Sequence, residues 1–497
     1  MSAHNFETPT RQSAKGIVVI FGVSLYRIVK ATIIIFAALV YKFISSGKTV
    51  YLTSTKFILI TLGILLLFLV IAILRYLNFK FYVSSDYFFL QKGIFNKEEI
   101  SVSTSKIQNV YIKQNVLQQI INVVSLSIET AGDDKTEIEI SALSKSKAEA
   151  LKTLLLKVAK PEAFIDGEIV EEAVYFKASI KKLFLEGVSE NHFKSFALIF
   201  AFIISIYNDI KAFVNQLELT SAFGSWFQLD EESLMTFILF NVTIVIVLII
   251  MSFFLSLIRM LIQNFNLTVK RKSEGLEISK GLLNKINLSL SASRIQNTTR
   301  TTNRLKQALG LYKLSFTQAM ANKKQQLNFN IVGLGKTQIN ELLEQFYPKA
   351  EERLIKHKPN KYLMYRLLSV SMLTLLLLNI PLYFGPRSLL FLNIPIVMLV
   401  VASAIFAYKK AYYYLDSNYI IVGSGKLIDT HTNFLEIKKV QAVSLNQSIF
   451  QKTRGLASVV IYTASKPLTI PHVELTTALT IKNYLLFKVE SENKDWM

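Results

Sequence analysis

The segment KIQNV at residues 106–110 recurs as RIQNT at 294–298 and as KVQAV at 439–443, and this repeat is the strongest indication of the fold. The three surrounding segments align without gaps across their middle. The further matched positions are Leu117, Leu305 and Phe450, and then Val123, Leu311 and Leu456. Self-similarity of this kind indicates that one supersecondary unit is used several times in the chain.

Turn residues recur at matching places in these segments. Gly310 and Gly455 share a position that is Asn122 in the first segment, which suits a turn with positive φ. Gly93 and Gly281 also coincide. These matches place the same turns in each copy of the unit.

Alternating apolar residues predict strands in every copy, as in residues 79–83 and 138–140. A short helix is expected over 116–121, followed by a strand over 123–130. Each copy then closes with an amphipathic helix, over 144–156, 336–346 and 473–488, with Ser144 and Thr337 as N-cap residues of the first two. The unit is therefore several antiparallel strands with an inserted short helix and a C-terminal helix.

Four uncharged apolar runs separate these units, at 57–74, 234–258, 367–386 and 388–408. Each can cross a hydrocarbon core, which needs about 20 helical residues. Two weaker candidates are 17–44, which carries Arg27 and Lys30, and 195–208. We interpret them as first members of helix pairs, with a helix lying in the membrane interface as the alternative for each. The count is then six transmembrane helices in three hairpins.

Basic residues near the ends of the spans predict the orientation. Those on one side are Arg11, Lys15, Arg75, Lys181, Lys182, Lys194, Lys270, Arg271, Lys272, Lys361, Lys409 and Lys410. The opposite side holds short connections, one of which, 209–234, has five acidic residues and a single lysine. Lys42, Lys48, Lys56 and Arg387 oppose this orientation but are the minority. We expect both termini and all long polar segments to be cytoplasmic.

Composition excludes several classes of protein. Of the 497 residues, 51% are hydrophobic and only 18% are charged, which excludes a disordered chain and an ordinary soluble protein. Cysteine is absent, so disulfides, cysteine-based metal sites and thiol nucleophiles are excluded. The five histidines show no metal-ligand spacing. We expect no catalytic residues, no cofactor and no metal site.

The motifs resemble one known family. A glycine after two strands, a basic residue with Ile-Gln-x-Val, a short helix and then L-x-I-x-T-A is similar to the bacterial pleckstrin-homology-like (PH-like) domain of YdbS/YdbT-type membrane proteins. Three such domains on three helix hairpins resemble the YdbT type. The third copy departs from the pattern at KVQAV, and the second carries Thr298, Thr299 and Arg300 where apolar residues are usual. The resemblance implies a PH-like barrel or bent sheet capped by a helix, in a multi-pass protein of the bacterial inner membrane.

The chain is expected to consist of ten segments. We expect a cytoplasmic N-terminus at 1–16 and a tail at 491–497, with a linker containing an amphipathic helix at 159–192 and a second linker at 348–361. The hairpins are at 17–78, 193–262 and 362–409. The PH-like domains, called copy 1, copy 2 and copy 3 below, are at 79–158, 263–347 and 410–490.

The excess positive charge is concentrated in copy 2. Residues 78–192 hold 14 basic and 16 acidic residues, residues 263–361 hold 18 and 6, and residues 409–497 hold 11 and 7. Basic residues next to a membrane attract anionic lipid. The candidate lipid or partner contacts are Lys270, Arg271, Lys272, Arg294, Arg300, Arg304 and Lys306. A solvated face with ordinary positive-inside topology is the alternative.

Two further features have a structural and a functional interpretation. The repeated Gln108, Gln296 and Gln441 are more simply explained as structural glutamines that bond neighbouring backbone, with ligand contact as the alternative. Residues 177–188 predict an amphipathic helix that either lies in the membrane interface or packs on a PH-like domain.

These features together indicate a class of function. We expect a non-enzymatic membrane protein whose PH-like domains bind anionic lipid or protein, within a membrane complex of the cell envelope. The family type suggests a protein partner that carries a single domain of the same kind. A transporter, or an export or defence component acting on a membrane-active compound, is the alternative. No nucleic-acid partner is expected, and the oligomeric state stays open.

Overall fold

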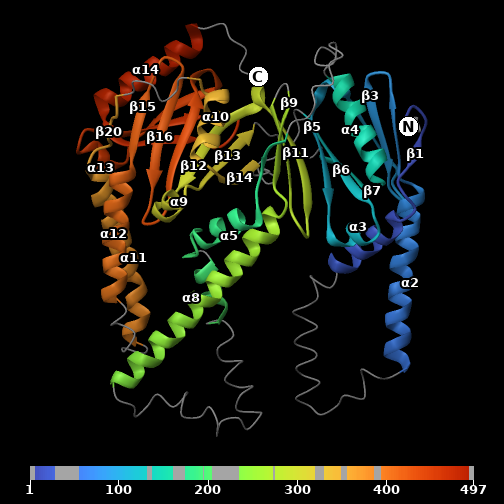
Figure 1. Ribbon diagram of the computed structural model, residues 1–497, viewed down its shortest axis with the longest axis horizontal. Helices are drawn as coiled ribbons and strands as arrows, with labels where there is room; N and C mark the ends of the chain where they lie inside the picture. Colours follow the sequence, from blue (N-terminus) through green and yellow to red (C-terminus); the bar gives the residue numbers. More distant parts are fainter. Residues whose placement is uncertain are drawn as a thin grey trace. The chain divides into compact units, whose positions relative to one another are not determined.

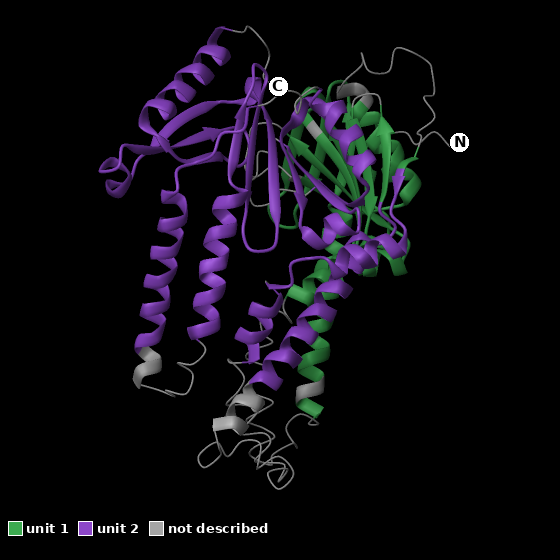
Figure 2. Ribbon diagram, turned by 60° about the vertical axis from the view of Figure 1, so that its left-hand side comes forward, with its two compact units in different colours: residues 1–175, 268–291, 320–326 green, residues 176–267, 292–319, 327–497 purple. Residues whose placement is uncertain are grey.

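The computed structural model describes residues 6–27, 55–130, 137–159, 174–193, 195–203, 234–272, 275–318, 329–348, 355–384 and 393–491 (Figure 1). The chain forms two compact units (Figure 2). Unit 1 comprises residues 1–175, 268–291 and 320–326, and unit 2 comprises 176–267, 292–319 and 327–497. The units do not follow the copies, because the first three strands of copy 2 belong to unit 1 and its last three belong to unit 2.

Copy 1 consists of two antiparallel three-stranded meanders and two helices. The first meander contains β2 (Lys80–Ser84), β3 (Tyr87–Lys92) and β4 (Glu98–Ser103), and the second contains β5 (Ile107–Gln114), β6 (Val124–Thr130) and β7 (Glu137–Leu143). The short helix α3 (Val116–Ile120) connects β5 to β6, and α4 (Lys145–Ala159) closes the copy. The two-residue strand β1 (Thr10–Arg11) adds to β2.

Copies 2 and 3 repeat this order of elements. Copy 2 contains β9 (Thr268–Lys272), β10 (Gly275–Lys280), β11 (Lys285–Ser291), β12 (Ile295–Thr302), α9 (Arg304–Ala308), β13 (Tyr312–Gln318), β14 (Phe329–Leu334) and α10 (Lys336–Phe346). Copy 3 contains β15 (Tyr412–Leu415), β16 (Tyr419–Gly425), β17 (Thr430–Glu436), β18 (Ala442–Asn446), α13 (Ile449–Lys452), β19 (Leu456–Tyr462), β20 (Leu468–Glu474) and α14 (Leu475–Ser491). The predicted threefold repeat is confirmed.

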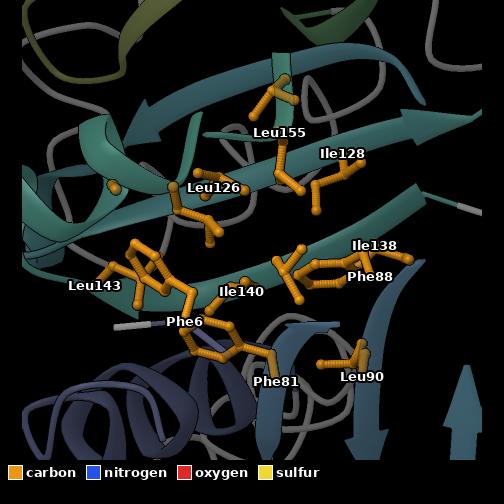
Figure 3. Packing of buried hydrophobic residues seen from close by; sticks show 14 of the residues in the cluster. Phe6, Phe81, Phe88, Leu90, Leu126, Ile128, Ile138, Ile140, Leu143 and Leu155 are labelled. Carbon is orange, nitrogen blue, oxygen red and sulfur yellow. The ribbon is translucent and has the colours of Figure 1, made fainter. Parts of the chain in front are cut away.

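The core of copy 1 lies between its two meanders and α4 (Figure 3). Alternate residues of the strands point inward, and the fully buried side chains include Phe81, Phe88, Leu126 and Ile140. Leu155 of α4 covers them. Burying one such side chain contributes about 1.5–3 kcal/mol. The same arrangement in copy 3 buries residues of β16, β17, β19, β20 and α14 together.

The matched turn residues have the predicted backbone. Asn122, Gly310 and Gly455 have φ values of 55°, 65° and 62°. Gly93 and Gly281 have φ values of 114° and 109°, and a Cβ atom at either would lie 2.0 Å from a carbonyl oxygen of the same turn. Glycine is therefore required at these two hairpin positions.

Two predictions about where helices start were wrong. The closing helix of copy 3 begins at Leu475 rather than at residue 473, because Val473 and Glu474 are the last residues of β20. The N-cap of α10 is Gly335 rather than Thr337. The Gly335 backbone N–H donates to Gln338 Oε1 at 3.0 Å, so a side chain three residues along the helix satisfies it.

Four described helices are long and apolar enough to cross a membrane: α2 (Thr55–Leu77), α8 (Leu234–Asn264), α11 (Tyr362–Phe384) and α12 (Asn393–Lys410). They correspond to the four strong runs of the sequence. The weaker candidate 17–44 lies outside the described residues from residue 28 onward, and the candidate 195–208 is helical over 195–203 and lies outside the described residues from 204 onward. Of the first, only a shorter apolar helix, Gly16–Arg27, is described.

The α11–α12 hairpin contains a reciprocal amide pair. Asn379 Nδ2 donates to Asn393 Oδ1 at 2.9 Å, and Asn393 Nδ2 donates to Asn379 Oδ1 at 2.7 Å. Both amides are thus satisfied within the hairpin, where unpaired polar groups would be costly in lipid.

Candidate interaction surface

Neighbouring copies share continuous sheets. The second meander of copy 1 and the first meander of copy 2 form one seven-stranded sheet, in the order β7-β6-β5-β11-β10-β9-β8, where β8 (Val174–Lys177) is an edge strand. The second meander of copy 2 and the first meander of copy 3 form a six-stranded sheet, in the order β14-β13-β12-β17-β16-β15. In both sheets the fourth strand of one copy pairs with the third strand of the next copy.

The two junctions have the same register. Gln114 of β5 lies opposite Lys285 of β11, and Thr302 of β12 lies opposite Thr430 of β17. In the gapless alignment of KIQNV, RIQNT and KVQAV, Gln114 corresponds to Thr302 and Lys285 corresponds to Thr430. A one-residue slip would turn every side chain to the other face of the sheet. The junction is therefore a repeated property of the unit.

Side chains reinforce each junction. In unit 2, Thr299 Oγ1 donates to Asn433 Oδ1 at 2.8 Å, and Thr301 Oγ1 lies 3.0 Å from His431 Nδ1. In unit 1, Gln119 Nε2 of α3 donates to the carbonyl oxygens of Leu282 and Leu283 in the β10–β11 turn, at 3.0 and 2.9 Å. The short helix of one copy thus contacts the hairpin turn of the next.

A buried carboxylate adds an ionic contact within unit 1. Glu277 Oε1 of β10 lies 3.1 Å from Lys152 Nζ of α4, and Glu277 Oε2 lies 2.7 Å from Lys272 Nζ of β9. Burial alone would raise the pKa of Glu277, but the two ammonium groups outweigh it and lower the pKa to about 2. Helix α4 of copy 1 is therefore ion-paired to copy 2.

Lys306 is a buried structural residue. Its Nζ donates to Glu186 Oε1 of α5 (Ile180–Val188), and Glu190 Oε1 lies 3.7 Å away. The Lys306 side chain is only 2% exposed. It cannot reach a lipid surface, and it is removed from the predicted contact residues for this reason.

The other predicted basic residues are divided between the two units. In unit 1, Lys270, Arg271 and Lys272 lie on β9, with the Arg271 guanidinium 4.3 Å from the Tyr175 ring centre and Lys272 paired with Glu277. In unit 2, Arg294 precedes β12, while Arg300 and Arg304 lie over the rings of Phe434 and Phe406, each at 5.4 Å. A role for these six residues at a surface stays a prediction.

The repeated glutamines have different surroundings. Gln296 is buried, and its Oε1 accepts a hydrogen bond from the Ala464 backbone N–H at 3.3 Å. Gln441 is exposed beside a hollow of about 640 Å³ in copy 3 that Asn418, Tyr419, Glu436 and Lys438 also line. The side chain of Gln108 lies outside the described residues. Among the residues that the structure describes, no three His, Asp or Glu side chains gather as metal ligands.

The sequence analysis missed a second set of matched residues. Gln118 and Gln451 are buried capping-box residues of α3 and α13, and Lys306 occupies their position in α9. Gln118 Nε2 donates to Ser125 Oγ at 2.6 Å, and Gln451 Nε2 donates to Ser458 Oγ at 2.9 Å. The sequence contains the corresponding capping-box patterns, N-x-x-Q at 115–118 and S-x-x-Q at 448–451.

His472 completes this polar cluster in copy 3. Its Nδ1 lies 2.8 Å from Gln451 Nε2, and its Nε2 lies 3.4 Å from Arg366 Nη1 of α11. Burial, and secondly the charge of Arg366, lower the pKa of His472 to about 4. The imidazole is therefore neutral near pH 7, and it links copy 3 to its hairpin.

Comparison with known proteins identifies the family. The model of the bacterial PH domain matches residues 18–159, 212–349 and 369–488, so the chain belongs to the bacterial PH domain family. Each match begins before the strands of a copy and ends in or just beyond its closing helix.

One relative matches most of the chain. The chain is 25% identical over 423 residues to the UPF0699 transmembrane protein YdbT of Bacillus subtilis (strain 168), a match that covers 80% of this chain and 83% of the relative. The resemblance drawn from the sequence is confirmed: this is a YdbT-type bacterial membrane protein with three PH regions.

Proposed function

We propose that the chain is a non-enzymatic assembly protein of the bacterial inner membrane, with its termini and PH-like copies on the cytoplasmic side. Its copies bind protein partners by adding strands edge to edge. The supporting observation is the pair of internal junctions, in which a PH-like copy recognises another by the same strands in the same register. Strand addition is a common mode of recognition, with main-chain hydrogen bonds supplying affinity.

The outer surface of β18 provides the test. Ser444 and Asn446 of β18 correspond to Thr299 and Thr301, whose side chains contact the next copy. In Ser444→Asp/Asn446→Asp, two carboxylates along this edge would oppose an incoming strand through desolvation. Thr480→Asp, at an exposed position of α14, is the matched control.

The experiment is capture of the full-length tagged chain from cross-linked native membranes. The expected result is a protein that co-purifies with the parent and with Thr480→Asp but is lost with Ser444→Asp/Asn446→Asp. Capture of no protein by any of the three, or equal capture by all three, would contradict edge-strand assembly.

Helix α5 supports a second function, contact with anionic lipid. Leu183 is buried and Gly187 packs against Leu257 of α8, whereas Ile180 is 68% and Phe184 46% exposed. Lys181 is also exposed on this helix. An exposed apolar stripe beside lysines is typical of a helix that lies in a membrane interface.

A matched pair of variants tests the lipid contact. Ile180→Ser/Phe184→Ser should lower the depth at which a fluorophore placed at Lys181 lies in the bilayer, when the full chain is reconstituted in vesicles that contain anionic lipid. Val174→Ser, at an exposed residue of β8, is the control. If the fluorescence were the same in the parent, in Ile180→Ser/Phe184→Ser and in Val174→Ser, insertion of α5 would be excluded.

A further inference from the structure

Among the strands that the structure describes, two sheet edges lack the neighbour that their counterparts have. Strand β4 is the third strand of copy 1, and its counterparts β11 and β17 each pair with the fourth strand of the preceding copy. Strand β18 is the fourth strand of copy 3, and its counterparts β5 and β12 each pair with the following copy. Among the described strands, β4 pairs only with β3, and β18 pairs only with β19.

We infer that β18 of one chain pairs with β4 of a second copy of the same chain, head to tail. This inference rests on the proposed function and names the partner. The two internal junctions show what a fourth strand pairs with. In both, its neighbour is the third strand of another PH-like copy. An interface in which different surfaces of identical chains meet is heterologous.

The internal junctions also specify the register. Thr301 lies opposite His431, and Lys113 lies opposite Ile286. The corresponding residues of the open edges are Asn446 and Glu98. Both are exposed, so the Asn446 amide can donate to the Glu98 carboxylate across the new junction.

Charge favours this pairing over the symmetric one. Glu98 and Glu99 are adjacent exposed acids on β4, and two β4 strands paired with each other would place like charges together. The β18 strand carries no acidic residue, and Lys452 follows on α13. Lys452 corresponds to Gln119, which donates to two carbonyl oxygens of the adjoining hairpin turn.

Exposed apolar side chains lie at both ends of the proposed junction. Phe95, in the β3–β4 turn, is 100% exposed, and it corresponds to Leu283, whose carbonyl accepts from Gln119. On α13, Ile449 is 81% and Phe450 68% exposed. Contiguous exposed apolar residues mark interaction sites, and Ile449 and Phe450 are adjacent on α13. The α13 surface therefore matches the β3–β4 turn in position and in character.

The chain contains no cysteine, so disulfide cross-linking can test the register directly. Two differently tagged full-length chains, one with Asn446→Cys and one with Glu98→Cys, are co-expressed and oxidised in native membranes. The intrachain pair Thr301→Cys/His431→Cys is the positive control, because these side chains already touch at the equivalent position. Asn446→Cys with Glu99→Cys is the register control, since Glu99 points to the other face of the strand.

The expected result is a mixed-tag product with the mass of two chains from Asn446→Cys and Glu98→Cys, and at least tenfold less product from the register control. Failure of this product while the positive control forms, or equal product from the register control, would overturn the inference. In that case the proposed function still stands if native capture recovers a different protein that the Ser444→Asp/Asn446→Asp variant loses. A protein with a single PH-like domain would then be the occupant of the edge.

Discussion

Lys306 and Glu186 form a buried ion pair that joins α9 to α5. Lys306 occupies the position that Gln118 holds in copy 1 and Gln451 holds in copy 3. In those copies the residue bonds within its own copy. In copy 2 the longer, charged side chain reaches a helix outside the copy, so one substitution in the repeat connects copy 2 to the segment that precedes α8.

Removing one partner of this pair should destabilise the protein strongly. Lys306→Met leaves the Glu186 carboxylate buried without a counter-charge, and the expected loss is about 3–5 kcal/mol of unfolding free energy. Denaturant unfolding of the full chain in detergent measures it. The double variant Lys306→Met/Glu186→Leu should recover most of the loss, because it removes both charges. A double variant as unstable as Lys306→Met would contradict a buried ion pair.

Unit 1 should lose stability in acid through Glu277. Its pKa is about 2 in the folded chain, below the ordinary value of 4.5, so the unfolded chain binds the proton first as the pH falls. The contribution is present above pH 4.5 and is lost progressively between about pH 4.5 and 2. Glu277→Gln should flatten the stability curve in this window, measured by unfolding at successive pH values. Glu139→Gln, at an exposed residue of β7, should leave the curve unchanged.

His472 should produce a second acid transition at higher pH. Its folded pKa of about 4 lies below the ordinary 6.5, so the fold favours the neutral imidazole. Stability is present above pH 6.5 and falls as the pH drops from 6.5 towards 4, by about 1–3 kcal/mol. His472→Asn should remove this dependence while keeping the backbone, because His472 has φ 49° and Asn tolerates that conformation. A variant with the parent's pH profile would exclude His472 as the titrating group.

The Asn379–Asn393 pair should contribute modestly to the α11–α12 hairpin. Asn379→Leu is expected to cost about 0.6–1.7 kcal/mol, the range found for hydrogen bonds between membrane helices. Thermal unfolding in detergent provides the measurement. Because the two amides bond each other, Asn379→Leu/Asn393→Leu should cost no more than the single change. Additive losses would mean that the two asparagines act independently, as through the hydrogen bond that Asn379 Nδ2 also donates to the Leu375 carbonyl oxygen at 2.8 Å.

Features set by neighbouring residues were predictable from the sequence. The turns at Asn122, Gly310 and Gly455, the short helix after each IQ motif and the four strong apolar helices all depend on local chemistry. The pattern of apolar residues also indicated the repeated fold. The sequence supplied no evidence for which strands of different copies would meet, because main-chain pairing leaves little trace in side-chain identity.

The site was less predictable because it depends on residues far apart in the chain. Lys306 reads as a surface base beside Arg300 and Arg304, and only the proximity of Glu186, 120 residues earlier, explains its burial. The motif glutamines attracted attention because their sequence is repeated, whereas Gln118 and Gln451 carry the matched bonds. A capping-box search within the alignment would have found the second pair.

Each shared sheet combines strands of two neighbouring copies, so the unit that is repeated in the sequence does not coincide with a unit of the fold. Since both internal junctions share one register, excising a whole repeat between equivalent residues of β5 and β12 would bring together two edges that already match. Gene rearrangement could thus remove or add whole repeats in such a chain without requiring a new type of strand pairing.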